Sequence, residues 1–204
     1  MRTGANRVWR SAAVALAAVV IVLDASASLS VYMAPEALAT RAPLAIEGTV
    51  VETASGLDPR NGRLATYVTI EVATVHRGPA DLERVTLREP GGRFGDLVHD
   101  LDAVPDYAPG EDVFVFLEPA RDGALRTAGM FFGKFRVVPA GGRGPVEAVR
   151  DLDGRGTIVG RSGPRLERFR RSDLRALVAG ATPGPHGSRP ARRPGSAPSA
   201  WSAT

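Results

Sequence analysis

The stretch LATYVTIEVATV, residues 64–75, decides the fold class of this chain. Val68, Ile70 and Val72 recur at every second position, and the residues between them are polar. A period of two built from β-branched residues is typical of a strand that buries one face. The stretch therefore predicts a long, half-buried β-strand.

Shorter versions of the same pattern recur along the chain and are separated by turns rich in Gly, Pro and Asn. They predict strands at residues 46–52, 84–88, 113–117, 125–130, 131–138 and 146–150. Near the C-terminal end, Ser172 as N-cap, an apolar stripe and Gly180 predict one short helix. Six or seven antiparallel strands with one short C-terminal helix favour a mainly β fold, a small OB-like antiparallel barrel, over a two-sheet sandwich.

The first 27 residues have the pattern of a signal peptide. Three arginines precede an apolar run from Ser11 to Leu23, and Ala25-Ser26-Ala27 matches a small-x-small cleavage site. The apolar run is shorter than the roughly 20 residues of a membrane-spanning helix, which favours cleavage after Ala27 over a retained anchor. We therefore expect an exported protein, periplasmic or extracellular, with no transmembrane span after cleavage.

Five segments are expected along the 204 residues. They are a signal peptide (1–27), a leader (28–44), an OB-like barrel domain (45–150), a linker with a short basic helix (151–180) and a disordered tail (181–204) rich in Pro, Gly, Ser and Arg. The chain has no cysteine, so disulfides, thiol catalysis and cysteine-based zinc sites are excluded.

Charge is distributed unevenly along the chain. Residues 28–160 carry 14 Lys and Arg against 19 Asp and Glu, a net charge of −5, whereas residues 161–204 carry nine Arg against two acids, a net charge of +7. Basicity therefore belongs to the C-terminal end, and the high overall pI does not indicate that the globular part binds nucleic acid.

Several short motifs occur together in a characteristic order. They are Glu47-Gly48-Thr49-Val50-Val51, Tyr67-Val68-Thr69-Ile70, Val75-His76-Arg77-Gly78, Gly91-Gly92, Pro109-Gly110-Glu111 before Phe114-Val115-Phe116-Leu117, and Gly133-Lys134-Phe135. Over residues 45–138 this order resembles an uncharacterised family of exported bacterial proteins, and the OB-fold of netrin-like modules and tissue inhibitors of metalloproteinases. The resemblance implies an OB-like fold. Those inhibitors chelate zinc through an N-terminal cysteine, which this chain lacks, so the resemblance does not extend to their inhibitory mechanism.

The longest stretch expected to be irregular, residues 93–111, holds an acidic group. Asp96, His99, Asp100 and Asp102, followed by Asp106, could offer ligands to Ca²⁺. Their spacing matches no established calcium loop and no Gly lies at a sharp central turn, so a solvated acidic loop is the expectation, with no metal and no other cofactor. The nucleophile elbow Gly-x-Ser-x-Gly is also absent from the sequence.

Two sets of residues are candidates for contact with a partner. His76 and Arg77 at a strand end, with Asp96 and His99 in the long loop, are candidates for binding a secreted or envelope protein. The C-terminal arginines are candidates for a polyanion, through salt-sensitive phosphate contacts, or form a solvated basic face: Arg165, Arg168, Arg170, Arg171 and Arg175. No specific nucleic-acid site is expected, because the phenylalanines suit core positions better than a stacking platform.

The sequence thus favours an exported, non-enzymatic β-barrel module that binds a protein partner at or outside the cell envelope. Two other hypotheses remain open: polyanion or envelope-surface binding through the arginine-rich end, and a metal-dependent hydrolase built on the acidic loop.

Overall fold

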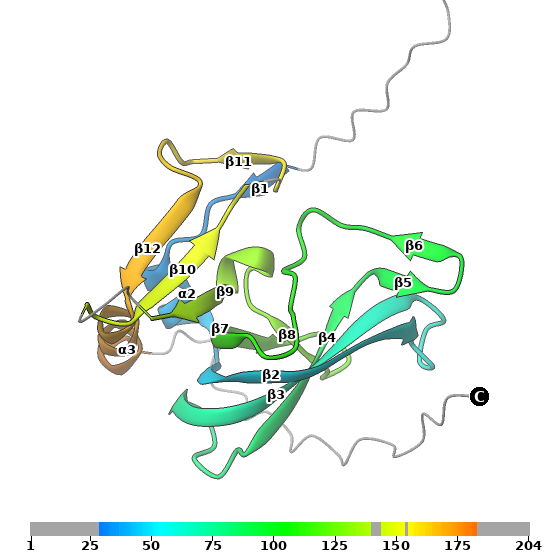
Figure 1. Cartoon of the computed structure of the whole chain (residues 1–204), viewed down its shortest axis with the longest axis horizontal. Coiled ribbons are helices and arrows are strands. Elements are labelled where there is room, and N and C mark those ends of the chain that lie inside the picture. Colours follow the sequence, from blue (N-terminus) through cyan, green and yellow to red (C-terminus); the bar gives the residue numbers. More distant parts are fainter. Residues whose placement is uncertain (1–28, 140–143, 154, 183–204) are drawn as a thin grey trace, which may run out of the picture.

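The computed structural model describes residues 29–139, 144–153 and 155–182 (Figure 1). The expected signal peptide at residues 1–27 lies outside the described residues, as does nearly all of the tail, residues 183–204. Within the described part the fold is mainly β, as the sequence predicted. None of the helices in these ranges is both long and apolar enough to cross a membrane.

Eight strands form one large sheet in the order β12-β10-β9-β7-β2-β3-β4-β8. Their bounds are β2 Leu44–Leu57, β3 Leu64–Arg77, β4 Arg84–Pro90, β7 Asp112–Pro119, β8 Leu125–Thr127, β9 Lys134–Val138, β10 Glu147–Asp151 and β12 Leu166–Arg170. Strand β8 also pairs antiparallel with β7, and it meets β4 in parallel at Leu87 and Leu125. The strand pairings therefore form a closed cycle of five strands: β7, β2, β3, β4 and β8.

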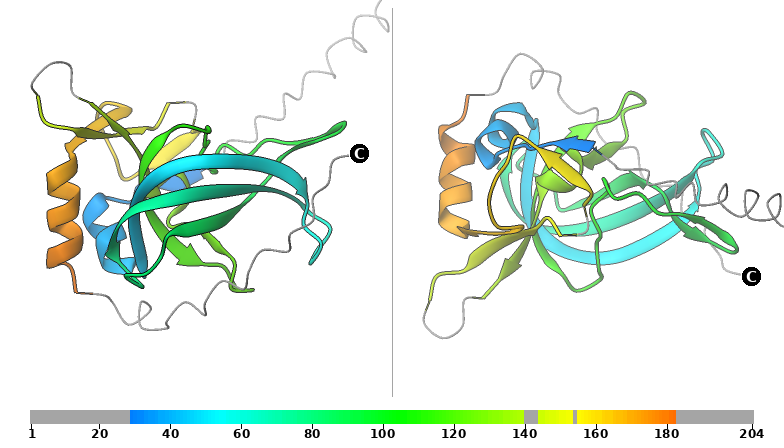
Figure 2. Two further views of the ribbon diagram at one scale, coloured as in Figure 1. Left: turned by 60° about the horizontal axis from the view of Figure 1, so that its bottom comes forward. Right: turned by 90° about the horizontal axis from the view of Figure 1, so that it is seen from above.

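Two small sheets and two helices complete the described chain. Strand β1 (Leu29–Val31) pairs in parallel with β11 (Thr157–Val159), and β5 (Gly92–Phe94) forms a hairpin with β6 (Leu97–His99). Helices α2 (Pro35–Arg41) and α3 (Arg171–Gly180) lie at one end of the molecule, and the β5–β6 hairpin projects at the other (Figures 1 and 2). We call these the helical end and the cavity end.

Strands β2 and β3 are 14 residues long and bend along their length. Their register shifts at three places in β2, one of them between Glu47 and Gly48. A Cβ atom at Gly48 would lie 2.2 Å from the carbonyl oxygen of Glu71, so only glycine lets the two backbones approach this closely. Irregularities of this kind increase local twist, which explains why two such long strands curve.

The apolar core has two parts. An aliphatic cluster fills the inward face of β2, β3, β4 and β7, and includes Ile46, Ile70 and Leu87. An aromatic cluster lies between β7, β9, the 3₁₀ turn η1 (Met130–Gly133) and the two helices, and includes Phe116 and Phe132. The second cluster explains why α2 and α3 pack at the helical end.

Local structure departs from the sequence-based expectation in four places. Residues 151–180, expected to be a linker with a short helix, also contain β11 and β12, and β12 belongs to the large sheet. Phe131 to Gly133, expected to be strand, form η1. Residues 93–111, expected to be irregular, contain most of the β5–β6 hairpin. The expected leader, residues 28–44, contains β1 and α2, and both bury side chains: Ser30 in β1 and Leu38 in α2.

Candidate binding site at the cavity end

The inward face of the sheet changes from apolar to polar toward the cavity end. On β4, Val85 and Leu87 belong to the aliphatic core, and the next inward position is Glu89. On the paired strand β3, Ile70 and Val68 are likewise followed by Thr66. Since successive inward positions on a strand are two residues apart, the core face itself ends in polar groups.

A cavity of about 380 Å³ lies over this polar end of the sheet. The sheet contributes Thr53, Ser55, Thr66, Val68, Glu89 and Pro90, and the β5–β6 hairpin and the loop after it contribute Gly92, Arg93, Val98, His99, Asp100, Leu101, Val104, Pro105, Asp106 and Tyr107. Its volume lies within the usual range for small-ligand sites, about 300–1,000 Å³.

Glu89 is the buried charged group of this cavity. Its side chain is 3% exposed, and its Oε1 accepts hydrogen bonds from the backbone N–H of Thr127 at 2.7 Å and from the Thr127 hydroxyl at 2.6 Å. Burial raises the pKa of Glu89 above its ordinary value, against the two bonds from Thr127, which lower it. The Tyr107 hydroxyl lies 2.6 Å from Thr127 Oγ1 and extends the network to the loop.

A second hydroxyl network lines the same cavity. Ser55 Oγ lies 2.9 Å from Thr66 Oγ1, and Thr66 donates to the carbonyl oxygen of Gly91. Gly92 packs directly on this pair: a Cβ atom there would lie 2.4 Å from Thr66 Oγ1, and its φ of +126° also favours glycine. The Gly91-Gly92 motif thus lets the chain leave β4 and start the hairpin against the hydroxyl pair.

The loop that covers the cavity is fixed to the rest of the fold by two cations. Lys134 donates to the carbonyl oxygen of Asp106 and, at 2.7 Å, to Glu111. Arg155 donates to the carbonyl oxygen of Val104 and to the carboxylate of Asp106. Burial lowers the pKa of Lys134, and the ion pair with Glu111 opposes this shift. The loop is therefore held at several points on both of its flanks.

In contrast, the β5–β6 hairpin exposes apolar side chains. Phe94 is 45% exposed, Leu97 is 54% exposed and Val98 is 55% exposed. All three lie within one short hairpin that projects beyond the large sheet (Figure 1). A cluster of exposed apolar side chains on a projecting element marks a contact surface more often than scattered ones do. We call residues 92–99 the arm.

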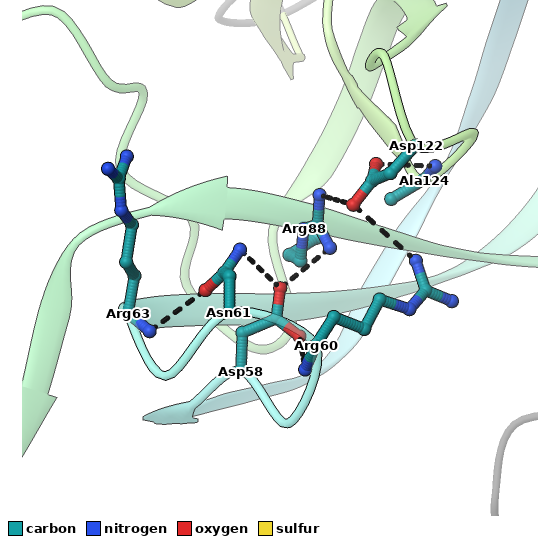
Figure 3. Close-up of polar contacts among 7 residues, drawn as sticks. All are labelled: Asp58, Arg60, Asn61, Arg63, Arg88, Asp122 and Ala124. Carbon is teal, nitrogen blue, oxygen red and sulfur yellow. Dashed lines mark hydrogen bonds and ion pairs between the residues drawn. The ribbon is translucent and has the colours of Figure 1, made fainter.

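Next to the arm, a polar cluster braces the β2–β3 turn (Figure 3). Asp58, 2% exposed, accepts hydrogen bonds from the Arg60 backbone, the Asn61 amide and, at 2.6 Å, the Arg88 guanidinium. Arg88 also donates to Asp122 in the β7–β8 turn, and this bond lowers the pKa of Asp122. The carboxylate of Asp58 thus has partners within the chain, which indicates a structural role.

The acidic candidates for a metal site do not form one cluster. His99, Asp100 and Asp106 line the cavity, whereas Asp96 and Asp102 do not. Asp96 lies in the arm, between β5 and β6. Among the described residues, no group of three or more His, Asp or Glu side chains could hold a metal ion.

His76 and Arg77, candidates for partner contact, lie at the helical end with their side chains engaged inside the fold. His76 stacks on Phe114 and lies 2.9 Å from the carboxylate of Glu47. Arg77 donates to four backbone carbonyls at the C-terminal ends of the two helices: Ala39, Ala42, Val178 and Ala181. These carbonyls have no partner within their own helices, so Arg77 caps α2 and α3 together.

Four of the five polyanion candidates also have partners within the chain. Arg175 donates two hydrogen bonds to Glu47, at 2.7 and 2.8 Å, and Arg171 lies 3.7 Å from the same carboxylate. Arg168 donates to Glu147, and Arg165 to the carbonyls of Leu152 and Gly156. Arg170 is exposed. Burial alone would raise the pKa of Glu47, but the hydrogen bonds and charges of Arg175 and His76 lower it to about 2.

Several buried charged residues were not singled out from the sequence. They include Glu89 and Arg150, and Arg150 is 1% exposed. Arg150 donates to Glu167 at 2.5 Å, to the Tyr32 hydroxyl and to two backbone carbonyls, and its guanidinium lies over the rings of three aromatic residues: Tyr32, Phe132 and Phe135. Burial lowers the pKa of Arg150 to about 10. For Arg150 the signal available in the sequence was a charged residue within the predicted strand 146–150.

Comparisons of the chain with protein-family models, with curated protein sequences and with solved structures found no match.

Proposed function

We propose that this chain is an exported, non-enzymatic module, built on an OB-like barrel, that binds a protein partner at or outside the cell envelope. The arm would carry the main contact. The observation that carries the proposal is the exposure of Phe94, Leu97 and Val98 on one projecting hairpin. Export rests on the signal-peptide pattern of residues 1–27.

The strand pairings support the OB-like part of the proposal. Five strands, β2, β3, β4, β8 and β7, pair in a cycle, and one pairing, between β4 and β8, is parallel. An OB-fold is a five-stranded, partly open Greek-key barrel that binds its ligands on a sheet face and the adjacent loops. The cavity of this chain is likewise lined by strands of the sheet and by the arm and the loop after it.

The composition of the arm supports a protein partner. Its exposed residues are one aromatic and two aliphatic side chains, and the core of a protein interface is enriched in such groups and depleted of charge. Arg93, Asp96 and His99 flank them, which gives the polar rim of a typical interface. The C-terminal arginines give less support to a contact surface, because four of the five polyanion candidates have acceptors within the described part of the chain.

The test is capture by the immobilised full chain from the secreted and envelope fractions of the producing organism. The variant carries Phe94→Ser with Leu97→Ser, and the matched control carries Val159→Ser with Leu166→Ser, two residues that are 45% and 39% exposed elsewhere. We expect one protein to be retained at high salt by the wild type and the control, and to be lost with the arm variant.

Salt distinguishes this function from polyanion binding. Capture that disappears at high salt and is unchanged in the arm variant would contradict the proposal and favour the arginine-rich end. Retention of the same protein by the arm variant would equally show that the arm is not the contact surface.

A further inference from the structure

We propose that the cavity beneath the arm binds a primary ammonium group, the side chain of a lysine in a bound partner segment. The inference rests on the proposed function in one respect, because the lysine is assigned to the protein partner proposed above. It is carried by the buried carboxyl of Glu89 and by the direction of the hydrogen bonds around it.

The hydroxyl protons of the first network all point toward Glu89. Thr127 donates its single hydroxyl proton to Glu89 Oε1, so the 2.6 Å contact between Tyr107 and Thr127 requires Tyr107 to be the donor. The chain of donors therefore runs from Tyr107 through Thr127 and ends at Glu89. None of these hydroxyl protons is left for a ligand.

The second network has the same property. Thr66 donates its hydroxyl proton to the carbonyl oxygen of Gly91, so Ser55 is the donor in its contact with Thr66. Both protons are used within the chain, and both oxygens keep lone pairs. The hydroxyls of Ser55 and Thr66 thus present acceptors to the cavity.

Glu89 supplies the acceptor that lacks a partner. Both of its hydrogen bonds go to Oε1, and Oε2 accepts none from the described residues. Ser30 Oγ and Arg161 Nε are the side-chain atoms of the described chain that are fully buried without a partner, so Oε2 keeps an accessible face, and Glu89 lines the cavity. This oxygen is therefore able to accept hydrogen bonds from a ligand in the cavity.

An ammonium group matches this arrangement. It has three donors and no acceptor, and its charge offsets that of the carboxylate. Carboxyl groups also outnumber cations in the lining, with Glu89, Asp100 and Asp106 against Arg93, although Asp106 already pairs with Arg155. An anionic ligand has no donors for the acceptor oxygens of the cavity and is repelled by the carboxylate of Glu89. An apolar ligand would leave Glu89 Oε2 without a hydrogen bond.

The experiment uses two small probes that differ by the ammonium group. Nα-acetyl-lysine N-methylamide carries the ammonium group, and Nα-acetyl-norleucine N-methylamide has a similar side chain without it. Each is titrated into the full chain while the backbone amide resonances are followed by NMR. We expect the lysine probe to shift the resonances of Thr66, Glu89 and Thr127 in a saturable way, and the norleucine probe to leave them unchanged.

Substitutions test whether the lysine probe binds in the cavity that Glu89 lines. Glu89→Gln keeps the acceptor for Thr127 and removes the charge, and it should weaken lysine-probe binding at least about tenfold. The matched control is Glu83→Gln, because Glu83 is exposed and does not line the cavity. Thr53→Leu, which fills the cavity and leaves the Glu89 network in place, should also abolish binding.

Equal binding of both probes, unchanged binding to Glu89→Gln, or no saturable binding of the lysine probe would each overturn the inference. The arm variant separates it from the proposed function, because Phe94→Ser with Leu97→Ser should still bind the lysine probe. A partner that is captured equally well by the wild type and by Glu89→Gln would leave the proposed function standing and remove the lysine from it.

Discussion

The two ends of the molecule treat buried charge in different ways. At the helical end, Arg150 has a carboxylate, a phenol and two carbonyls as partners, and Arg77 has four carbonyls. At the cavity end, Glu89 is buried to a similar degree, yet only one of its two oxygens has partners among the described residues. A charge whose bonds are complete within the chain holds the fold together, whereas one with a free atom facing a cavity can gain by binding.

The exposure of apolar side chains also differs between the two helices and the arm. Leu38, Leu174 and Val178, from α2 and α3, are buried in the aromatic core at the helical end. The apolar residues of the arm remain exposed at the cavity end. The two helices therefore bury their apolar side chains within the chain, whereas the cavity end presents both an apolar surface and a carboxyl oxygen without a partner among the described residues.

The largest expected effect on the free energy of unfolding comes from a substitution of Arg150. Arg150→Met keeps much of the side-chain volume but leaves Glu167 and two carbonyls short of a donor in a buried site. Removing one partner of a buried ion pair costs about 3–5 kcal/mol. We expect a loss of that size in the free energy of unfolding, measured by urea denaturation at pH 7.

Arg136→Met is the matched control for this substitution. Arg136 is exposed on β9, so the same change there should alter the free energy of unfolding by no more than about 0.5 kcal/mol. If Arg150→Met behaved like this control, Arg150 would not be a structural centre and the contrast between the two ends would disappear.

Strands and helices whose signal lies in neighbouring residues of the sequence were predicted well. The period of two at Val68, Ile70 and Val72 identified β3. The helix α3 was also identified, but its N-cap is Arg170, two residues before the expected N-cap Ser172, and no side chain caps it. The strand expected at residues 131–138 was only half right, because Gly129 and Met130 have positive φ and turn the chain into η1 before β9 begins. The aromatic residues there are buried in a turn and not in a strand, a difference that hydrophobicity does not reveal.

The roles of the charged residues could not be predicted, because their partners are distant in sequence. Arg175 belongs to an apparent basic face, but its carboxylate partner, Glu47, is 128 residues away. The carbonyls that Arg77 caps at α3 are more than 100 residues away. For Glu89 the sequence held a local signal, since an acid follows Val85 and Leu87 at the next inward position of β4.

A smaller effect, with a defined pH dependence, is expected at Glu47. Because its pKa is lowered to about 2 in the folded chain, the ionised form stabilises the fold at pH values above the ordinary pKa of 4.5, and this contribution is lost as the pH falls from about 4.5 to about 2. Glu47→Gln should therefore cost about 1–3 kcal/mol at pH 7, and the difference from the wild type should shrink over that acidic range.

Urea denaturation at a series of pH values measures this dependence, with Glu52→Gln as the control, since Glu52 lies on the same strand and is exposed. A loss that stayed constant from pH 7 to pH 2 would show that the carboxylate charge of Glu47 does not stabilise the helical end.

The smallest expected effect is an increase in the free energy of unfolding, and it comes from a Glu→Gln substitution at the cavity end, Glu89→Gln. Burial raises the pKa of Glu89, so the unbound folded chain disfavours the ionised form, and wild-type stability decreases as the pH rises above the ordinary pKa of the group. Glu89→Gln keeps the acceptor for Thr127 and removes the charge, and it should increase the free energy of unfolding at pH 7 by less than Glu47→Gln decreases it. This increase should vanish in acid, where Glu89 is protonated in the folded and in the unfolded chain. If Glu89→Gln instead destabilised the chain at pH 7, the carboxylate would have the complete set of partners that marks the helical end, and no ligand would be needed to explain it.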